Sequence, residues 1–295
     1  MYKPTAKGYF SGCGGMEIGL MQAGINIIQS LDLDVEAIAC MNLNKHYFSH
    51  SILHADIKDK TVLEQPKSDI IVGTYPCTKY SPIADIHGTR TGDDLFLHFF
   101  RHIAIEKPEM YIVENVPGMK KFEVVMEAMT KLPGYYVNVF CPVDAAYWLP
   151  QRRKRLILIG TRRQYSIAAP TQKSNVASIK SLLEINPEVP MPDYVIKRIK
   201  GNYRDFPIIV DPDLLNSIAP TCVAHYSKDL STRLVKDKSS QHGLRPFSVR
   251  EYARLQGFPE DFNFDNKRSS YRLIGNAVPV NMGKWVGGVA LKYFQ

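Results

Sequence analysis

Cys77, Glu114 and a pair of arginines are the residues of this chain whose types and positions point most directly to chemistry. Cys77 follows Pro76 in a short polar segment that comes just after the apolar run 69–72. A cysteine on a loop at the end of a strand, close to Lys79, is placed as a nucleophile would be, because a neighbouring cation lowers the pKa of a thiol. Cysteine is also a common small core residue, and position alone leaves that alternative open.

Glu114 and a basic run are two further candidates for functional residues. Glu114 closes the apolar run 110–113, and a glutamate rarely stands at the end of a buried strand without a partner or a task. The run Gln151-Arg-Arg-Lys-Arg155 is either a solvated basic surface or a clamp for phosphate groups. An intervening helix would make the strands before Cys77 and Glu114 parallel neighbours, so we expect both side chains at one crevice.

The segment Phe10-Ser-Gly-Cys-Gly-Gly15 has the composition of a turn against which a ligand can rest. Its glycines would let the ligand approach the main chain closely, although a plain tight turn has the same composition. Asp32 follows about twenty residues later, where a carboxylate could accept hydrogen bonds from ribose hydroxyls. Asp56, at the end of a further expected strand, is suited to an adenine amino group, and an exposed loop aspartate is its alternative.

Short apolar runs alternate with amphipathic stretches in the first half of the chain and would position all of these residues. The runs are 25–31, 69–72, 110–113, 135–140 and 156–160, and helical patterns fit between them, as in 95–106. This alternation predicts an α/β fold with a Rossmann-like, doubly wound and mostly parallel sheet. Ligands of such sheets bind at the carboxyl ends of the strands.

The composition and the hydrophobic pattern of the sequence change near residue 164. From 164 to 243 the chain is polar, irregular and rich in proline, which predicts a second, smaller domain. A helical pattern returns after Ser248, a suitable N-cap with Glu251 three residues later. We therefore expect a catalytic domain over 1–163, a small domain over 164–243, and a C-terminal segment, 244–295, that returns to the catalytic domain.

Composition limits the class of protein. The 295 residues are 45% hydrophobic and 22% charged, as in globular proteins. The net charge of +8 is a weak indication of a polyanionic partner, since a solvated basic surface would have the same charge. Five scattered cysteines without a Cys-x-x-Cys pair suggest neither a disulfide framework nor zinc. His98 and His102 have metal-ligand spacing but lack an evident third ligand, so we expect no metal. No apolar stretch is long enough to span a bilayer, and we expect a cytoplasmic protein.

Six motifs occur in the order in which they are found in one known family. They are Phe10-Ser-Gly-Cys-Gly-Gly15, Pro76-Cys77, Glu114-Asn-Val116, Gln151-x-Arg-x-Arg155, Arg250-Glu-Tyr-Ala-Arg-Leu-Gln-Gly-Phe-Pro259 and Gly275-Asn-Ala-Val-Pro279. Together they resemble the conserved series of the DNA (cytosine-5-)-methyltransferases of the bacterial restriction-modification type. The resemblance covers nearly the whole chain apart from about 164–217, and six ordered motifs are far more specific than any one of them.

The resemblance implies transfer of a methyl group from S-adenosylmethionine to carbon 5 of a flipped-out cytosine in a specific short duplex sequence, with S-adenosylhomocysteine as product. Cys77 would attack carbon 6, Glu114 would hold the ring, and two arginines would steady the substrate. The implied catalytic residues are Cys77, Glu114, Arg153 and Arg155. The implied cofactor-binding residues are Phe10, Gly12, Gly14, Gly15, Asp32, Leu33, Asp56, Ile57, Pro76, Leu95, Asn276, Ala277 and Val278. The implied DNA-binding residues are Ser81, Gln151 and Thr221.

The resemblance also implies partners. The small domain would recognise the target sequence in double-stranded DNA, and a cognate restriction endonuclease would be a further partner. We expect a monomer that associates with the nucleoid through DNA and not with a membrane.

The chain departs from the family pattern at four positions, and two other functions stay open. Gly8 stands where the family usually has aspartate, Asp32 replaces the commoner glutamate, Thr78 replaces a frequent glutamine, and Ala277 replaces serine. A tRNA cytosine methyltransferase would share the catalytic motifs. A catalytically silent nucleic-acid binder would share the fold, although the intact Cys77 and Glu114 argue against it.

Overall fold

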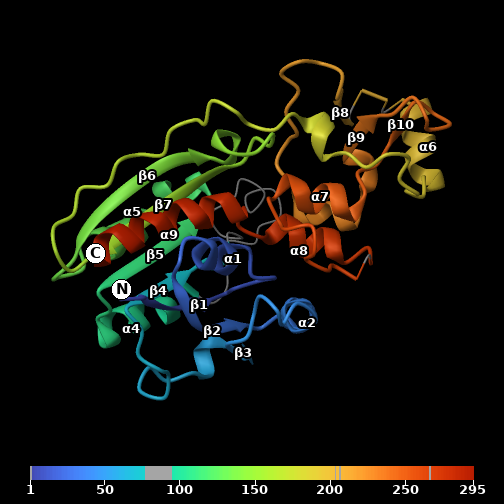
Figure 1. Cartoon of the computed structure of the whole chain (residues 1–295). Coiled ribbons are helices and arrows are strands. Elements are labelled where there is room, and N and C mark those ends of the chain that lie inside the picture. The colour runs from blue at the N-terminus through green and yellow to red at the C-terminus, as the bar shows by residue number, and fades with distance from the viewer. Residues whose placement is uncertain (1, 77–94, 203, 206, 266) are drawn as a thin grey trace. The chain divides into compact units, whose positions relative to one another are not determined.

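The computed structural model describes residues 2–76, 95–202, 204–205, 207–265 and 267–295 (Figure 1). The chain folds into two compact units. The first comprises Met1–Asp144, Lys154–Pro170 and Met282–Gln295, and the second comprises Ala145–Arg153 and Thr171–Asn281. These units do not coincide with the three expected segments, since 145–153 and 244–281 group with the second unit. The recognition role expected for 164–243 stays a prediction.

A seven-stranded sheet forms the centre of the first unit, in the order β3-β2-β1-β4-β5-β7-β6. The five strands from β3 to β5 are parallel to their neighbours, and β7 is antiparallel to both β5 and β6. The predicted α/β fold with a mostly parallel sheet is therefore confirmed. The strands are β1 (Thr5–Tyr9), β2 (Asn26–Asp32), β3 (Ser51–His54), β4 (Ile70–Gly73), β5 (Met110–Asn115), β6 (Tyr136–Asp144) and β7 (Lys154–Thr161).

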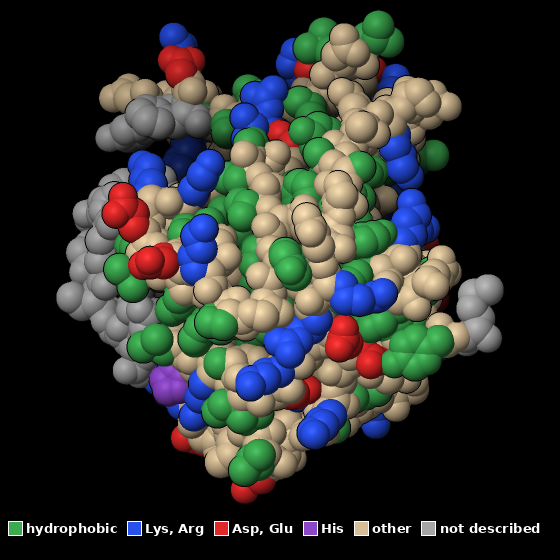
Figure 2. Space-filling view, turned by 90° about the vertical axis from the view of Figure 1, so that its left-hand side faces the viewer, with side chains coloured by type: hydrophobic (Ala, Val, Ile, Leu, Met, Phe, Trp, Pro, Cys, Tyr) green, Lys and Arg blue, Asp and Glu red, His purple; other side chains and the backbone are tan. Residues whose placement is uncertain are grey.

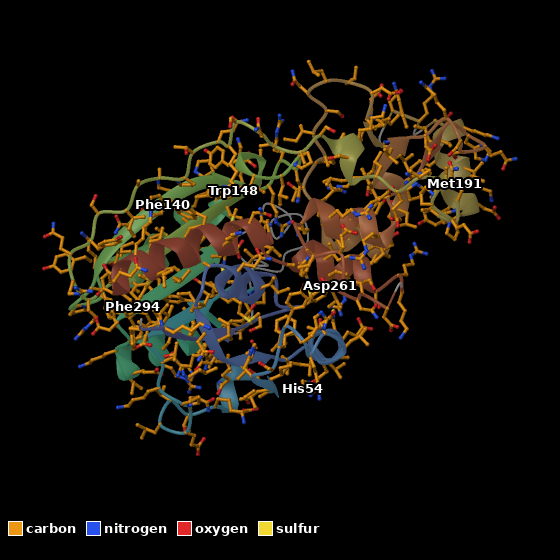
Figure 3. The ribbon with its side chains drawn as sticks, viewed as in Figure 1. His54, Phe140, Trp148, Met191, Asp261 and Phe294 are labelled. Carbon is orange, nitrogen blue, oxygen red and sulfur yellow. The ribbon has the colours of Figure 1, made fainter. Side chains whose placement is uncertain are left out.

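Helices cover both faces of this sheet because successive strand side chains point to opposite faces. Tyr9, Tyr111 and other residues of one face are buried in a core with Phe99 of α4 (Leu95–Glu106) and with α5 (Glu123–Thr130). The other face meets α1 (Gly15–Gln22) and α9 (Val280–Phe294), and Phe140 of β6 packs edge-on against Trp285 with ring centroids 5.3 Å apart (Figure 3). The remaining elements of this unit are α2 (Val35–Leu43) and the 3-10 helices η1 (Ile57–Asp59) and η2 (Pro117–Lys121).

The close packing of α1 against α9 depends on glycine. A Cβ atom at Gly283 would lie 2.7 Å from the main-chain oxygen of Met16, and one at Gly287 would lie 3.1 Å from the Cα of Leu20. The two helices therefore approach each other at distances that a larger residue at either position would prevent. This contact joins the first and the last helix of the chain within one unit.

The second unit is built around a three-stranded sheet, β10-β9-β8. The strands are β8 (Ile208–Val210), β9 (Arg233–Lys236) and β10 (Leu244–Arg245). The helices are α6 (Asp193–Lys200), α7 (Val249–Leu255), α8 (Ser270–Asn276), η3 (Ala145–Tyr147), η4 (Ile179–Leu182), η5 (Ala224–Ser227) and η6 (Leu230–Thr232). With so little regular structure, this unit depends on specific polar contacts.

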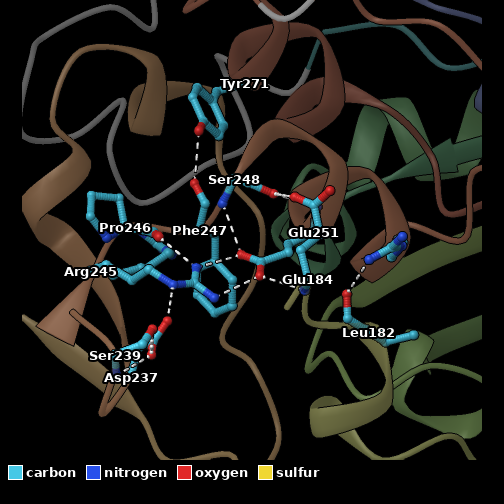
Figure 4. Close-up of polar contacts among 12 residues, drawn as sticks. Leu182, Glu184, Asp237, Ser239, Arg245, Pro246, Phe247, Ser248, Glu251 and Tyr271 are labelled. Carbon is cyan, nitrogen blue, oxygen red and sulfur yellow. Dashed lines mark hydrogen bonds and ion pairs between the residues drawn. The ribbon is translucent and has the colours of Figure 1, made fainter. Parts of the chain in front are cut away.

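A buried ion-pair network fixes the start of α7 (Figure 4). The predicted capping box is present, because Glu251 N donates to Ser248 Oγ and Ser248 N donates to the Glu251 carboxylate. That carboxylate also accepts two hydrogen bonds of 2.8 Å from Arg245, which binds Asp237 through its Nε. The charges are thus paired and hydrogen-bonded inside the unit, which is the condition for burying them.

One face of the molecule is seen in Figure 2, where Lys and Arg side chains lie between hydrophobic and acidic ones. On this face the positive charge is spread out, as on a solvated surface. In the described part of the chain, no helix has the length and apolar character needed to cross a bilayer.

Candidate active site

Glu114 and Arg155 form an ion pair across two strands of the first unit. The Nε atom of Arg155, on β7, lies 2.8 Å from Oε1 of Glu114, on β5. The side chain of Arg155 is only 12% exposed and that of Glu114 only 9%. Since β5 and β7 are antiparallel neighbours, the sheet itself brings a residue of the basic run to the carboxylate. This pairing, which was not predicted from the sequence, is thus partly a property of strand register.

The loop that leads to Cys77 begins beside this ion pair. β4 runs parallel to β5, and Gly73 at its end lies opposite Val113, the residue before Glu114. Tyr75 then accepts a hydrogen bond of 3.1 Å on its main-chain oxygen from Asn115 Nδ2. Pro76, which follows, is exposed. Cys77, Thr78, Lys79 and Ser81 lie outside the described residues.

The same loop is fastened to the glycine-rich turn. Thr74 donates from its main-chain N to Tyr9 O and from its hydroxyl to Phe10 O, at 3.2 and 2.8 Å. The rings of Phe10 and Tyr75 also meet edge to face, with centroids 6.2 Å apart. Two of the predicted segments, at the ends of β1 and β4, therefore lie together as expected for parallel strands that are neighbours.

The glycine-rich turn leaves β1 in a conformation that needs left-handed residues. Phe10, Gly12 and Gly14 have φ angles of 63°, 56° and 84°, so two of the three positions use the freedom of glycine. Asp32 holds the turn, since its carboxylate accepts from Gly12 N at 2.7 Å and from Asp34 N at 2.8 Å. Burial raises the pKa of Asp32, and these main-chain donors lower it. A Cβ at Gly12 would meet nothing within 4 Å, so the turn is open there.

The residues expected near an adenine have different surroundings. Leu33, just after β2, is 60% exposed, which is unusual for leucine and leaves an apolar surface beside Asp32. Asp56 follows His54 at the end of β3 (His54 is labelled in Figure 3) and caps η1 by accepting from Lys58 N at 3.0 Å. Ile57 is buried in the core, and its main-chain oxygen accepts a hydrogen bond of 2.6 Å from Arg101.

Five further cofactor positions are less informative. Leu95 is partly buried at the start of α4, and Gly15 begins α1. Asn276, Ala277 and Val278 belong to the second unit, where Asn276 is exposed and the other two are buried. Gln256 Nε2 donates to the main-chain oxygen of Ala277 at 3.0 Å. The expected closing of the cofactor pocket by these three residues stays a prediction.

Arg153 is buried in the second unit, and both of its terminal nitrogens bind main-chain oxygens. Its two terminal nitrogens donate to the carbonyl oxygens of Cys222, Gly275 and Ala277, at 2.6, 3.1 and 2.9 Å. Its exposed fraction is 2%. These contacts differ from the expected contact with substrate, and they make Arg153 the support of two loops, one before η5 and one after α8.

Gln151 supports the same loops. It is fully buried, donates from Nε2 to the main-chain oxygen of Leu255 at 2.7 Å, and accepts from Cys222 N at 2.9 Å. Direct contact with DNA would require its side chain to leave this network. Thr221, next to Cys222, is partly exposed and donates from its hydroxyl to the main-chain oxygen of Arg152 at 2.7 Å.

Glu17 is a residue of this region that sequence reasoning missed. It lies in the first turn of α1, is 2% exposed, and its Oε2 has no hydrogen-bond partner among the described residues. The same is true of the buried hydroxyl of Ser11 in the glycine-rich turn. Burial raises the pKa of Glu17 to about 7. An acidic residue directly after a glycine-rich segment was the available signal.

The two histidines with metal-ligand spacing lie on α4. His102 is buried with its Nδ1 3.0 Å from Tyr9 Oη, and burial lowers its pKa to about 4, which keeps the ring neutral. Within the described residues, no group of three His, Cys, Asp or Glu side chains is placed to hold a metal. His102 is thus a hydrogen-bonded core residue.

Comparison with known proteins gives consistent matches. The family model described as C-5 cytosine-specific DNA methylase matches residues 8–292. The type II methyltransferase M.BsuFI of Bacillus subtilis is 30% identical over 95% of this chain and 70% of its own length, and M.Sau96I of Staphylococcus aureus is 27% identical over 97% and 75%. Among solved structures, the methyltransferase EhMeth of Entamoeba histolytica has a TM-score of 0.83 at 17% identity over 100% of both chains. Dnmt2 of S. pombe has a TM-score of 0.80 at 20% identity, over 99% of this chain and 100% of that one. The structural likenesses show a shared fold.

Proposed function

This chain belongs to the C-5 cytosine-specific DNA methylase family and is a DNA (cytosine-5-)-methyltransferase, and we propose that it uses S-adenosylmethionine and a covalent adduct of Cys77 with a flipped-out cytosine. The observation that carries the mechanism is the ion pair of Glu114 and Arg155 beside the loop that leads to Cys77. The ion pair holds the Glu114 carboxylate at the carboxyl ends of the parallel strands β4 and β5, where ligands of such sheets bind.

The glycine-rich turn fits a nucleoside cofactor. It is open beside Gly12, and it has an acceptor in Asp32 and an exposed apolar side chain in Leu33. It also contains buried polar atoms without partners, in Ser11 and Glu17. In this proposal Asp32 holds the ribose and Leu33 packs against the adenine. The cofactor supplies an electrophilic methyl group when bound. The other residues proposed to line it are Phe10, Gly12, Gly14, Gly15, Asp56, Ile57, Pro76, Leu95, Asn276, Ala277 and Val278.

Cys77 begins the reaction in this proposal. Its thiolate adds to carbon 6 of cytosine, which makes carbon 5 nucleophilic, because the ring then carries an enamine. Glu114 holds the ring at N3 and the exocyclic amine, and as the carbon–sulfur bond forms it passes to N3 a proton that its carboxylate has taken up from solvent. Arg155 keeps the Glu114 carboxylate in the orientation that this transfer needs.

The second half of the reaction restores the aromatic ring. Once carbon 5 carries the methyl group, a base removes its proton, the electron pair forms the double bond between carbons 5 and 6, and Cys77 leaves as thiolate. N3 returns its proton to the Glu114 carboxylate. A base stacked in a duplex is out of reach of these groups, so the cytosine must be flipped out at a cost of a few kcal/mol.

Arg153 and Gln151 support the site indirectly in this proposal. They fix the main chain at Cys222 and thereby the neighbouring Thr221, which we propose contacts the backbone near the flipped nucleotide, with Ser81 a further contact from the loop after Cys77. The net charge of +8 favours the phosphate backbone as partner. The names of the similar type II methyltransferases support a paired restriction endonuclease, and we propose a cytoplasmic monomer that associates with the nucleoid through DNA.

Tritium transfer from labelled S-adenosylmethionine to duplex DNA and to tRNA tests the proposal. Wild-type protein should label DNA at cytosines of one short sequence, found by single-base methylation mapping, and Cys77→Ala should label nothing. Label in tRNA alone would identify the RNA enzyme. Cofactor-induced thermal stabilisation without any transfer would favour a silent nucleic-acid binder.

A further inference from the structure

Glu17 places a carboxyl group inside the protein directly under the glycine-rich turn. A Cβ atom at Gly8, in β1, would lie 2.2 Å from Oε1 of Glu17 and 2.9 Å from Oγ of Ser11. The carboxyl group of α1 therefore fills the space that any side chain at position 8 would need. Position 8 is also where this sequence departs from the family pattern, since it has glycine in place of aspartate.

Burial of this carboxyl group in its ionised form destabilises the folded protein when no ligand is bound. No ion pair joins Glu17 to a Lys, Arg or His among the described residues, and Asp32 and the thiol of Cys13 are the titratable groups that face it. Burial raises the pKa of Glu17 to about 7, because the ionised form loses its water without gaining a cation. Packing alone would be served better by a neutral side chain of the same shape.

A positively charged ligand on the turn would supply the absent cation. S-adenosylmethionine carries a sulfonium and an ammonium group, whereas S-adenosylhomocysteine keeps the ammonium group but has a neutral sulfur. Inside a protein the interaction of a carboxylate with a cation is weakly screened and extends over several ångströms. On the basis of the proposed function, we infer that Glu17 is a specificity-determining residue whose carboxylate, seated over Gly8 beneath the turn, favours the methylated cofactor over its demethylated product.

Isothermal titration of the full chain at pH 8 with each of the two compounds tests this inference. Glu17→Gln keeps the shape and removes the charge, and it should weaken S-adenosylmethionine binding about tenfold more than S-adenosylhomocysteine binding. Its thermal midpoint should equal or exceed that of the wild type. Glu123→Gln is the matched control, because Glu123 is an exposed first-turn glutamate of another short helix, and it should leave both affinities unchanged.

An unchanged ratio of the two affinities in Glu17→Gln would overturn the inference, as would equal loss of both affinities with a lower thermal midpoint. If Glu17→Gln does not fold, Glu17→Ser with Gly8→Asp returns the carboxyl group to β1. That double variant should regain the preference for S-adenosylmethionine, and its failure to do so would also refute the role of the charge. Wild-type protein that binds neither compound would instead refute the proposed function.

Discussion

Arg155 holds Glu114 through its Nε atom, at 2.8 Å, from the neighbouring antiparallel strand. Both residues belong to the first unit, so this part of the site is formed within one compact body. The arrangement separates two functions that the sequence run 151–155 seemed to combine. Arg155 serves the carboxylate, whereas Arg153 serves the main chain of the second unit.

Loss of the contact between Arg155 Nε and Glu114 should lower catalysis without lowering cofactor affinity. Arg155→Lys cannot reproduce the Nε contact, because an ammonium is a point charge on a flexible stem. We expect kcat to fall about 100-fold, as for a misplaced acid-base group, with the Kd for S-adenosylmethionine unchanged. Single-turnover methylation of DNA measures the first quantity and isothermal titration the second. Lys154→Ala, the exposed neighbour, should behave as wild type.

Cys77→Ala should abolish methyl transfer and leave cofactor binding intact, since the thiolate is needed only for addition to the base. The readouts are tritium transfer and thermal shift with S-adenosylmethionine. Cys141→Ala, which removes a partly buried cysteine elsewhere, should retain transfer. Residual methylation by Cys77→Ala at more than trace level would contradict the covalent mechanism.

Asp32→Ala should weaken cofactor binding more than it weakens any other step of the reaction. It removes the acceptor of Gly12 N and of Asp34 N, so the turn loses the contacts that hold its shape. The loss of one charge-assisted hydrogen bond is worth roughly 1.5–3 kcal/mol, or about 10- to 100-fold in Kd. Titration calorimetry should show this loss, and Asp59→Ala, at an exposed aspartate of η1, should not.

Arg153→Ala should destabilise the protein, because three buried carbonyl oxygens lose a charged donor and, in the described part of the chain, only that of Ala277 keeps another, from Gln256. We expect the free energy of unfolding to fall by about 3 kcal/mol or more, with no rescue by lysine. Urea unfolding measures the change, and Arg152→Ala, at an exposed position, is the control. A variant with wild-type stability but no activity would instead assign Arg153 to the substrate.

Stability should depend on pH through Glu17. Burial raises its folded-state pKa to about 7, against 4.5 as the ordinary value. Since the folded-state pKa is the higher one, the contribution to stability is complete below pH 4.5 and is lost as the pH rises through 7. The free energy of unfolding of Glu17→Gln, relative to that of the wild type, should therefore rise by up to about 3 kcal/mol between pH 5 and pH 8. Urea unfolding at both pH values that gives the same difference would contradict the assignment.

Much of the fold follows from local pattern. The helix expected over 95–106 is α4, and the capping box at Ser248 and Glu251 begins α7 as predicted. The basic run near β7 shows what pattern could not reveal. Charge alone makes its members equivalent, but alternation along an extended chain buries Gln151 and Arg153 and exposes Arg152 and Lys154.

The carboxyl group of Glu17 could not be foreseen for a related reason. Its role depends on which side of the sheet Gly8 faces and on the distance between β1 and α1. Neither the side of the sheet that Gly8 faces nor the distance between β1 and α1 can be derived from the positions of the two residues in the sequence. Motif order predicted the ends of β1, β4 and β5 as one site because parallel strands end at a common edge, which is a topological rule.

The packing of α9 against α1 has a consequence for biosynthesis. The first unit takes its central strands from the beginning of the chain and its covering helix, Met282–Gln295 with Gly283 and Gly287, from the end. A ribosome adds the whole second unit before it makes that helix. Until then, the side of α1 that α9 covers stays exposed to solvent, so the first unit can complete its fold only after residues 282–295 have been made.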